Sequence, residues 1–235
     1  MTTKQRIWEL DAFRGLCVLG MIVVHFVYDL TAFGGLELEV PYWFRLIQDY
    51  GNLFFILLSG ICATLAGRSF KRGVLVFGAG LLISYVTLFM EYVLGFRQIT
   101  IWFGILHLLG VSMMLFPLLR KLPHWALLLL GAVLAVLGYW MTTVRVGVPF
   151  LFPLGLRQPD FFTGSDYFPL LPFFGWFVIG AGLGKLVYRR KQSLLPRVNA
   201  DFFLLRFLRF VGRHSLEIYL LHQPVLSGIT ALLFL

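Results

Sequence analysis

The chain has 235 residues, of which 59% are hydrophobic and only 13% are charged, and its mean hydropathy is +0.86. Soluble domains carry about 25% charged residues, so this composition excludes an ordinary soluble domain, a disordered chain and a secreted disulfide scaffold. It predicts an all-α polytopic membrane protein. The formal net charge of +9 therefore has to be compared with membrane topology before nucleic-acid binding is considered.

Seven apolar stretches are long enough to cross a bilayer, which takes about 20 residues per helix. Seven such helices use most of the chain, so we expect one bundle and a single transmembrane domain over residues 1–235. The first stretch is too long for a signal peptide and lacks a small-residue cleavage site, so we expect it to remain as a helix. In chain order the predicted spans are 9–31, 51–67, 74–94, 101–119, 124–142, 168–188 and 212–235.

Lysine and arginine are distributed unevenly over the loops between these spans. With a cytoplasmic N-terminus, Arg14 lies inside the first span and most other basic residues fall on inner segments, whereas the outer loops hold only Arg45, Arg97, Arg145 and Arg157. Because positive residues favour the cytoplasmic side, we expect a cytoplasmic N-terminus, an extracytoplasmic C-terminus and no nucleic-acid partner. A basic inner surface also suits anionic membrane lipid or a phosphorylated cofactor.

Three connecting segments differ in character. Residues 32–50 mix glycine, proline and aromatic residues with acidic ones, which suits an interfacial or re-entrant segment. The loop at 143–167 is long and rich in proline, so we expect it to cover the outer face as a lid or rim. Residues 189–209 form a basic inner connector that contains Pro196.

Four ionisable residues of the first predicted span lie on one side of the helix, and such residues are expensive inside a bilayer and usually face a cavity. At about 100° per residue, Arg14 and His25 lie roughly 20° apart, and Asp11 and Asp29 fall within about 60° of Arg14. Asp29 can accept a hydrogen bond from one nitrogen of His25, which leaves the other nitrogen free to act as a base. The alternative is structural: Arg14 pairs with Asp11, and His25 makes an interhelical hydrogen bond.

A second histidine, His107, lies in the fourth predicted span between Gly104 and Gly110, small residues that allow another helix to approach closely. His25 and His107 are both about six residues from the outer end of their span, roughly 9 Å deep, so we expect them to meet. Two histidines at one depth serve catalysis, metal binding, haem ligation or helix packing. No metal is expected, because Cys17 and Cys62 both sit in apolar runs.

The last predicted span places Ser215, Tyr219 and His222 on one side, followed by Gln223 and Pro224, and the proline bends the helix so that polar groups can shape a cavity. Polar residues also stand at the outer ends of the second and third spans; there an interfacial position costs little, so solvation at the surface is their alternative role. The candidate substrate-binding residues are Glu91, His222, Gln223 and Asn52.

The polar residues occur in motifs that resemble those of known membrane enzymes. The run from Leu10 to Leu16, with His25 eleven positions after Arg14, resembles the first-helix motif of acyltransferase-three-type proteins. It is more similar to the catalytic domain of heparan-alpha-glucosaminide N-acetyltransferases, in their small bacterial form. Further blocks that share this resemblance lie at 25–30, 103–110, 169–175 and 214–224.

The resemblance implies an acyl-CoA-dependent transmembrane acyltransferase of the bacterial inner membrane (EC 2.3.1 type). Such an enzyme moves an acetyl or other acyl group from cytosolic acyl-CoA to an amino or hydroxyl group of an extracytoplasmic sugar, glycolipid or other envelope acceptor, and a homodimer is compatible with it. Arg14, with Asp11, would bind the CoA end. His25, oriented by Asp29, would act as base or take the acyl group, and His107 would polarise the thioester carbonyl.

Three other functions fit the same intramembrane residues. A proton-coupled transporter or flippase would use His25, Asp29 and His107 as a relay, although the absence of sequence repeats weighs against it. A haem protein would use the two histidines as axial ligands. A non-catalytic membrane scaffold would tolerate substitution of His25.

Overall fold

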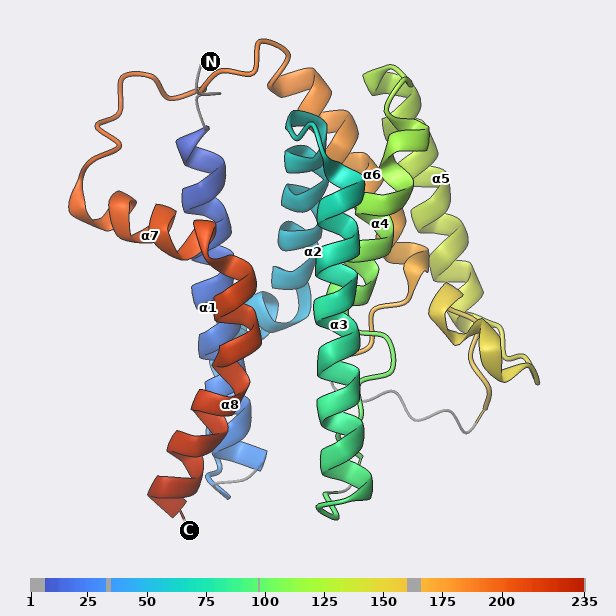
Figure 1. The fold of residues 1–235 in the computed structure, drawn as a ribbon, viewed down its shortest axis with the longest axis vertical. Coiled ribbons are helices and arrows are strands. Elements are labelled where there is room, and N and C mark those ends of the chain that lie inside the picture. Colours follow the sequence, from blue (N-terminus) through green and yellow to red (C-terminus); the bar gives the residue numbers. More distant parts are fainter. Residues whose placement is uncertain (1–6, 33–34, 97, 160–165, 235) are drawn as a thin grey trace. The chain divides into compact units, whose positions relative to one another are not determined.

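The computed structural model describes residues 7–32, 35–96, 98–159 and 166–234, and this part of the chain is helical apart from loops and one isolated bridge between Arg145 and Arg157 (Figure 1). The predicted all-α class is therefore confirmed. The helices are α1 (Trp8–Ala32), α2 (Tyr42–Leu65), α3 (Ser69–Tyr92), α4 (Ile105–Leu119), α5 (His124–Thr143), the 3₁₀ helix η1 (Pro149–Leu154), α6 (Leu170–Val187), α7 (Phe203–Arg213) and α8 (Ser215–Phe234).

Six of these helices are long and apolar enough to cross a membrane: α1, α2, α3, α5, α6 and α8. The stretch expected as a seventh span, 101–119, contains α4, which is apolar but has only 15 residues. Seven crossings and the orientation of the chain therefore stay predictions. Arg97 and parts of the loops at 32–50 and 143–167 lie outside the described residues.

Two boundaries differ from the sequence prediction. The second helix begins at Tyr42, so its first turns replace half of the segment expected to be interfacial. Pro41 directly precedes it, and the carbonyl of Pro41 accepts hydrogen bonds from the amides of Phe44 and Arg45, which starts the helix. The expected connector at 189–209 ends within helix α7, which runs on to Arg213 and which hydropathy misses because arginines interrupt its apolar residues.

The contacts within the chain divide it into two compact units, which are described separately. One unit consists of Met1–Phe55 and Arg190–Leu235, and the other of Ile56–Arg189. The first unit contains α1, the start of α2, α7 and α8; the second contains the rest of α2 and the helices α3 to α6. The expectation of a single domain stays a prediction.

In the first unit, α1 packs against both α7 and α8, and α7 runs across α1 (Figure 1). Glycines allow this crossing: a Cβ atom on Gly15 would collide with the carbonyl of Leu208, and one on Gly212 would collide with the carbonyl of Asp11. The two helix backbones are thus in direct contact, as small residues permit in membrane proteins. Nearby, Glu9 accepts hydrogen bonds from the Ser193 hydroxyl and the Leu194 amide.

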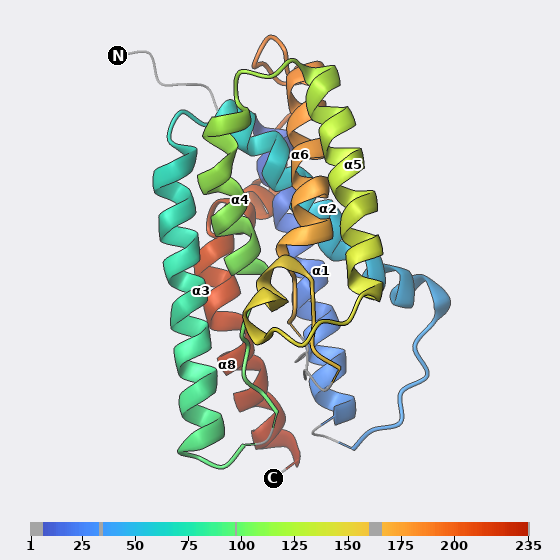
Figure 2. The same ribbon diagram turned by 90° about the vertical axis from the view of Figure 1, so that its right-hand side faces the viewer.

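In the second unit, the helices pair as α3 with α4 and α5 with α6 (Figure 2). Gly110 of α4 lies against Phe77 of α3, which confirms the close approach expected at Gly110. Gly180 and Gly184 of α6 lie against the backbone of α2, a close approach that small residues permit. The centre of this unit holds the fully buried rings of Phe116 and Phe177, which meet edge to face.

The crossing of α1 and α7 can be tested by adding one methyl group. We expect Gly15→Ala to lower the free energy of unfolding by about 1–3 kcal/mol, because the helices have to move apart. Gly20→Ala is the matched control, since nothing lies within 4 Å of a Cβ atom at Gly20 on the same helix. Thermal unfolding of the purified protein in detergent measures both. Equal melting temperatures would contradict a tight crossing.

Candidate functional site

The polar face that the sequence predicts for α1 begins with a charged cluster near the start of the helix. Arg14 Nη1 lies 3.9 Å from Asp11 Oδ1, and Arg213 Nε of α7 lies 3.5 Å from Asp11 Oδ2. The pairing of Arg14 with Asp11 is the structural alternative that the sequence raised. At 3.9 Å this pair is longer than a hydrogen bond, so the Arg14 guanidinium keeps donors for another partner.

Farther along α1, His25 is oriented by its own helix. Its Nδ1 lies 2.9 Å from the carbonyl oxygen of Met21, four residues earlier. Because a carbonyl only accepts, the proton sits on Nδ1 and the lone pair of the neutral ring sits on Nε2. We expected Asp29 to hold the ring, and this was wrong: side chains of a helix lean toward its N-terminus, so the ring reaches back to Met21. One nitrogen is nevertheless fixed and the other left as a base.

Asp29 has a different partner. Its side chain is completely buried (0% exposed), and both carboxyl oxygens accept hydrogen bonds from Gln223 Nε2 of α8, at 3.0 and 3.1 Å. A buried carboxyl without such a donor is strongly unfavourable. Asp29 and Gln223 therefore fix α1 and α8 against each other at the depth of His25.

His222 completes this cluster. Its ring meets the ring of His25 edge to face, with centroids 4.9 Å apart, and its Nδ1 lies 2.5 Å from the carbonyl oxygen of Tyr219. In the described part of the chain, His222 Nε2 and Gln223 Oε1 are buried and have no hydrogen-bond partner. Both are acceptors, so a molecule that offers N–H or O–H groups would satisfy them.

The structure thus brings together four of the predicted site residues, His25, Asp29, His222 and Gln223, and we call these the α1/α8 cluster. Asp11 and Arg14 lie on the same helix, with about 16 Å of helix between Arg14 and His25. Asn52 belongs to the same unit, on α2, and its Oδ1 is buried without a partner among the described residues. His107 and Glu91 belong to the other unit, so a meeting of His25 and His107 stays a prediction.

Within the second unit, both ring nitrogens of His107 are occupied. The Gly104 amide donates to Nδ1 at 3.1 Å, and Nε2 lies 3.3 Å from Ser84 Oγ, which itself donates to the carbonyl of Ile101. The ring is buried and stacks on Phe103. These contacts favour helix packing, one of the roles that the sequence left open for His107.

Glu91 also serves its own unit. One of its carboxyl oxygens accepts hydrogen bonds from the amides of Ile99 and Thr100 and from the Thr100 hydroxyl, at 3.1, 2.9 and 2.6 Å. Glu91 therefore ties the loop after α3 to the end of that helix. Its predicted contact with substrate stays untested.

Sequence reasoning missed two side chains that order the second unit. Asp166 Oδ1 accepts a hydrogen bond from the Ile105 amide at the start of α4, where helix amides lack partners. The Tyr167 hydroxyl donates to the carbonyl of Phe152 in η1, and burial raises the pKa of Tyr167 to about 12, so this phenol remains a donor. No local signal in the sequence points to this role of Asp166, because the helix start that it caps lies 61 residues earlier in the chain.

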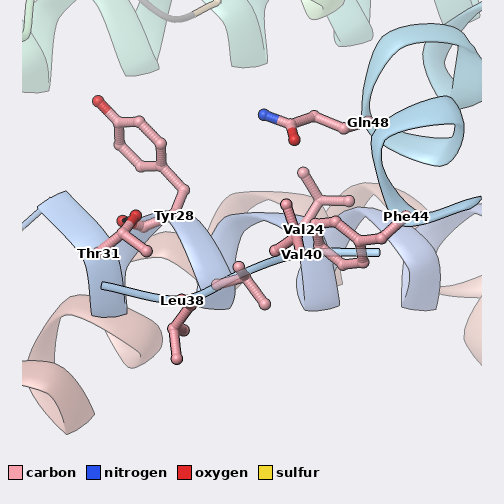
Figure 3. Close-up of a pocket in the computed structure, with 8 residues that line it drawn as sticks. Val24, Tyr28, Thr31, Leu38, Val40, Phe44 and Gln48 are labelled. Carbon is pink, nitrogen blue, oxygen red and sulfur yellow. Dashed lines mark hydrogen bonds between the residues drawn. The ribbon is translucent and has the colours of Figure 1, made fainter. Parts of the chain in front are cut away.

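A small pocket lies elsewhere on the first unit. It is lined by four residues of α1, by Leu38 and Val40, and by Phe44 and Gln48 of α2 (Figure 3), and its volume is about 110 Å³. Small-molecule sites usually measure about 300–1,000 Å³, so it is too small for a sugar or a nucleotide. The α1 residues that line it are Val24, Val27, Tyr28 and Thr31, which face away from His25 and Asp29 on the helix.

A family model described as heparan-alpha-glucosaminide N-acetyltransferase, catalytic, matches residues 6–224. The chain belongs to this family. The resemblance found in the sequence is thereby confirmed. The described part of the chain has six apolar helices of membrane-spanning length, so the protein is an integral membrane protein of an acetyltransferase family. The match extends from before α1 into α8 and includes the whole α1/α8 cluster. Searches of curated proteins and of solved structures gave no match.

Among the described residues, no group of three or more histidine, cysteine, aspartate or glutamate side chains is arranged to hold a metal ion.

The pairing of Asp29 with Gln223 predicts a specific loss of stability. We expect Gln223→Leu to lower the free energy of unfolding by about 1–3 kcal/mol, because a buried carboxyl loses its donor. The double variant Asp29→Leu/Gln223→Leu should recover part of this loss, since neither group is then unpaired. Chemical unfolding in detergent measures both, with the exposed Gln48→Leu as control. A Gln223→Leu protein as stable as the control would refute the pairing.

Proposed function

We propose that the protein is a membrane-embedded acyltransferase that moves an acetyl group from acetyl-CoA to an amino or hydroxyl group of an extracytoplasmic sugar or other envelope acceptor, in a bacterial inner membrane. The family match supports acetyl transfer. The observation that carries the proposal is the state of His25: Met21 holds its Nδ1 proton, so the lone pair on Nε2 is ready to take a proton.

In the proposed reaction, His25 Nε2 removes the proton from the acceptor as its nitrogen or oxygen attacks the thioester carbonyl carbon. A new C–N or C–O bond forms, the C–S bond to CoA breaks, and the proton on His25 passes to the departing CoA thiolate. His25 returns to its starting state. The alternative route, in which His25 first takes the acetyl group itself, differs in leaving an acetylated enzyme between the two half-reactions.

The unpaired acceptors of the α1/α8 cluster support a sugar as the second substrate. His222 Nε2 and Gln223 Oε1 are buried lone-pair groups that need donors, and the hydroxyl and amino groups of a sugar are donors. Because Gln223 also holds Asp29, its amide oxygen is fixed in orientation. We infer that His222 and Gln223 position the acceptor beside His25.

The charged start of α1 supports a place for the donor. Arg14 and Arg213 share the single carboxylate of Asp11, so the cluster retains positive charge that suits the phosphates of a CoA. The polar face of α1 then leads about 16 Å from Arg14 to His25. An extended acyl-CoA bound at Arg14 would follow this face with its thioester toward His25.

The test is turnover of acetyl-CoA by the purified protein in proteoliposomes, followed by release of the CoA thiol with amino sugars and neutral sugars as acceptors. We expect His25→Ala to reduce turnover about 10²–10⁴-fold, the usual contribution of a general base, with an unchanged melting temperature. His124→Ala, an exposed histidine at the start of α5, is the control and should retain activity. Full turnover by His25→Ala would refute the proposal.

The donor site makes a separate prediction. Arg14→Ala should weaken binding of acetyl-CoA, because its phosphates lose a charged donor, and should change the maximal rate much less. Saturable thermal stabilisation of the protein by acetyl-CoA measures the binding. If the apparent affinity for acetyl-CoA is the same in Arg14→Ala and the wild type, Arg14 does not bind the donor and has only a structural role in its ion pair with Asp11.

A further inference from the structure

Helix α7 carries three different surfaces around its axis, separated according to the helical period. One surface faces α1 and is buried, one is apolar and exposed, and one is basic. The buried surface includes Val211 and Gly212. The exposed apolar surface consists of Phe203, Phe207 and Phe210, and the basic surface of Arg206, Arg209 and Arg213.

The three phenylalanines are exposed, with 72% of Phe203, 45% of Phe207 and 57% of Phe210 accessible. An aromatic patch of this kind needs an apolar cover. With 11 residues, α7 is about 16 Å long, too short to cross a bilayer. Since α7 also runs across α1, a helix of membrane-spanning length (Figure 1), its direction suits the plane of the membrane.

The positive charge of the basic surface is only partly neutralised by neighbouring carboxylates. Arg209 Nη1 donates to the carbonyl of Ala200 at 2.8 Å and lies 3.5 Å from Asp201, and Arg213 contacts Asp11, which Arg14 already contacts. Arg206 is exposed, and its side chain makes no ion pair or hydrogen bond within the described ranges. Its guanidinium has five donors, so it is free to hold an anion.

We propose that α7 lies in the membrane interface and binds the phosphate of an anionic phospholipid through Arg206, with its phenylalanine surface among the acyl chains. A basic surface beside an exposed aromatic one is the arrangement by which amphipathic helices bind anionic bilayers. The topology prediction places this segment on the cytoplasmic side. A soluble phosphate ligand would satisfy Arg206 but would leave the aromatic surface uncovered, which is why a lipid is the occupant.

The glycine crossing gives this interfacial helix a fixed direction. Gly15 and Gly212 hold the backbones of α1 and α7 in contact, so α7 does not rotate freely about its axis. The phenylalanine and arginine surfaces therefore keep their orientation relative to α1. This inference is independent of the proposed acetyl transfer.

The charge can be tested by adding phosphatidylglycerol or phosphatidylcholine with identical acyl chains to the protein in a neutral detergent. We expect saturable thermal stabilisation by phosphatidylglycerol, with an apparent affinity about fivefold weaker in Arg206→Gln. Arg145→Gln, an exposed arginine in the loop after α5, should respond like the wild type. Equal effects of the two lipids, an unchanged response of Arg206→Gln, or stabilisation through Arg206 by inorganic phosphate alone would overturn the proposal.

The aromatic surface has its own test, which does not depend on charge. Spin labels are attached to Phe207→Cys and, one residue away on the basic surface, to Arg206→Cys, in a protein with Cys17 and Cys62 replaced by alanine and placed in lipid nanodiscs. We expect dissolved oxygen to reach the label at 207 better than a water-soluble nickel chelate does, and the reverse at 206. A label at 207 that is open to the chelate, or shielded from both reagents, would contradict burial in lipid.

Discussion

The buried carboxyl of Asp29 is the constraint around which the first unit is organised. A carboxyl group removed from water needs a donor, and Gln223 supplies one hydrogen bond to each of its oxygens. This contact sets α8 against α1 at a single register, which brings the rings of His222 and His25 together. The same contact occupies the amide nitrogen of Gln223, so the groups left without a partner among the described residues, Gln223 Oε1 and His222 Nε2, are acceptors. The α1/α8 cluster therefore favours ligands that carry hydrogen-bond donors.

Much of the fold could be predicted from the sequence, because hydropathy and the helical period are local properties. The common face of Asp11, Arg14, His25 and Asp29 follows from spacing within one helix. The partner of Asp29 could not be predicted, since Gln223 reaches it only through the packing of two helices distant in the chain. The partner of His25 is local, but the sequence favours the Asp29 carboxylate over the backbone carbonyl of Met21, which the structure shows as the partner.

The errors at α7 and α2 have a related origin. A search for apolar stretches averages over a window, so three arginines hide the apolar residues of α7, although their spacing repeats with the helical period. At α2, the aromatic and polar composition after Pro41 concealed a helix that proline starts. Composition was a good guide to which helices are long and apolar and a poor guide to where helices begin.

The order in which the chain is synthesised gives the contact between Asp29 and Gln223 a further meaning. Gln223 follows Asp29 by 194 residues, so α1 leaves the ribosome long before its partner exists. Until then the carboxyl of Asp29 has to stay hydrated, protonated or shielded by the insertion machinery, because lipid offers it no donor. The first helix made is thus among the last to reach its final environment. In a chain that ends before α8, the carboxyl of Asp29 lacks the donor that Gln223 supplies.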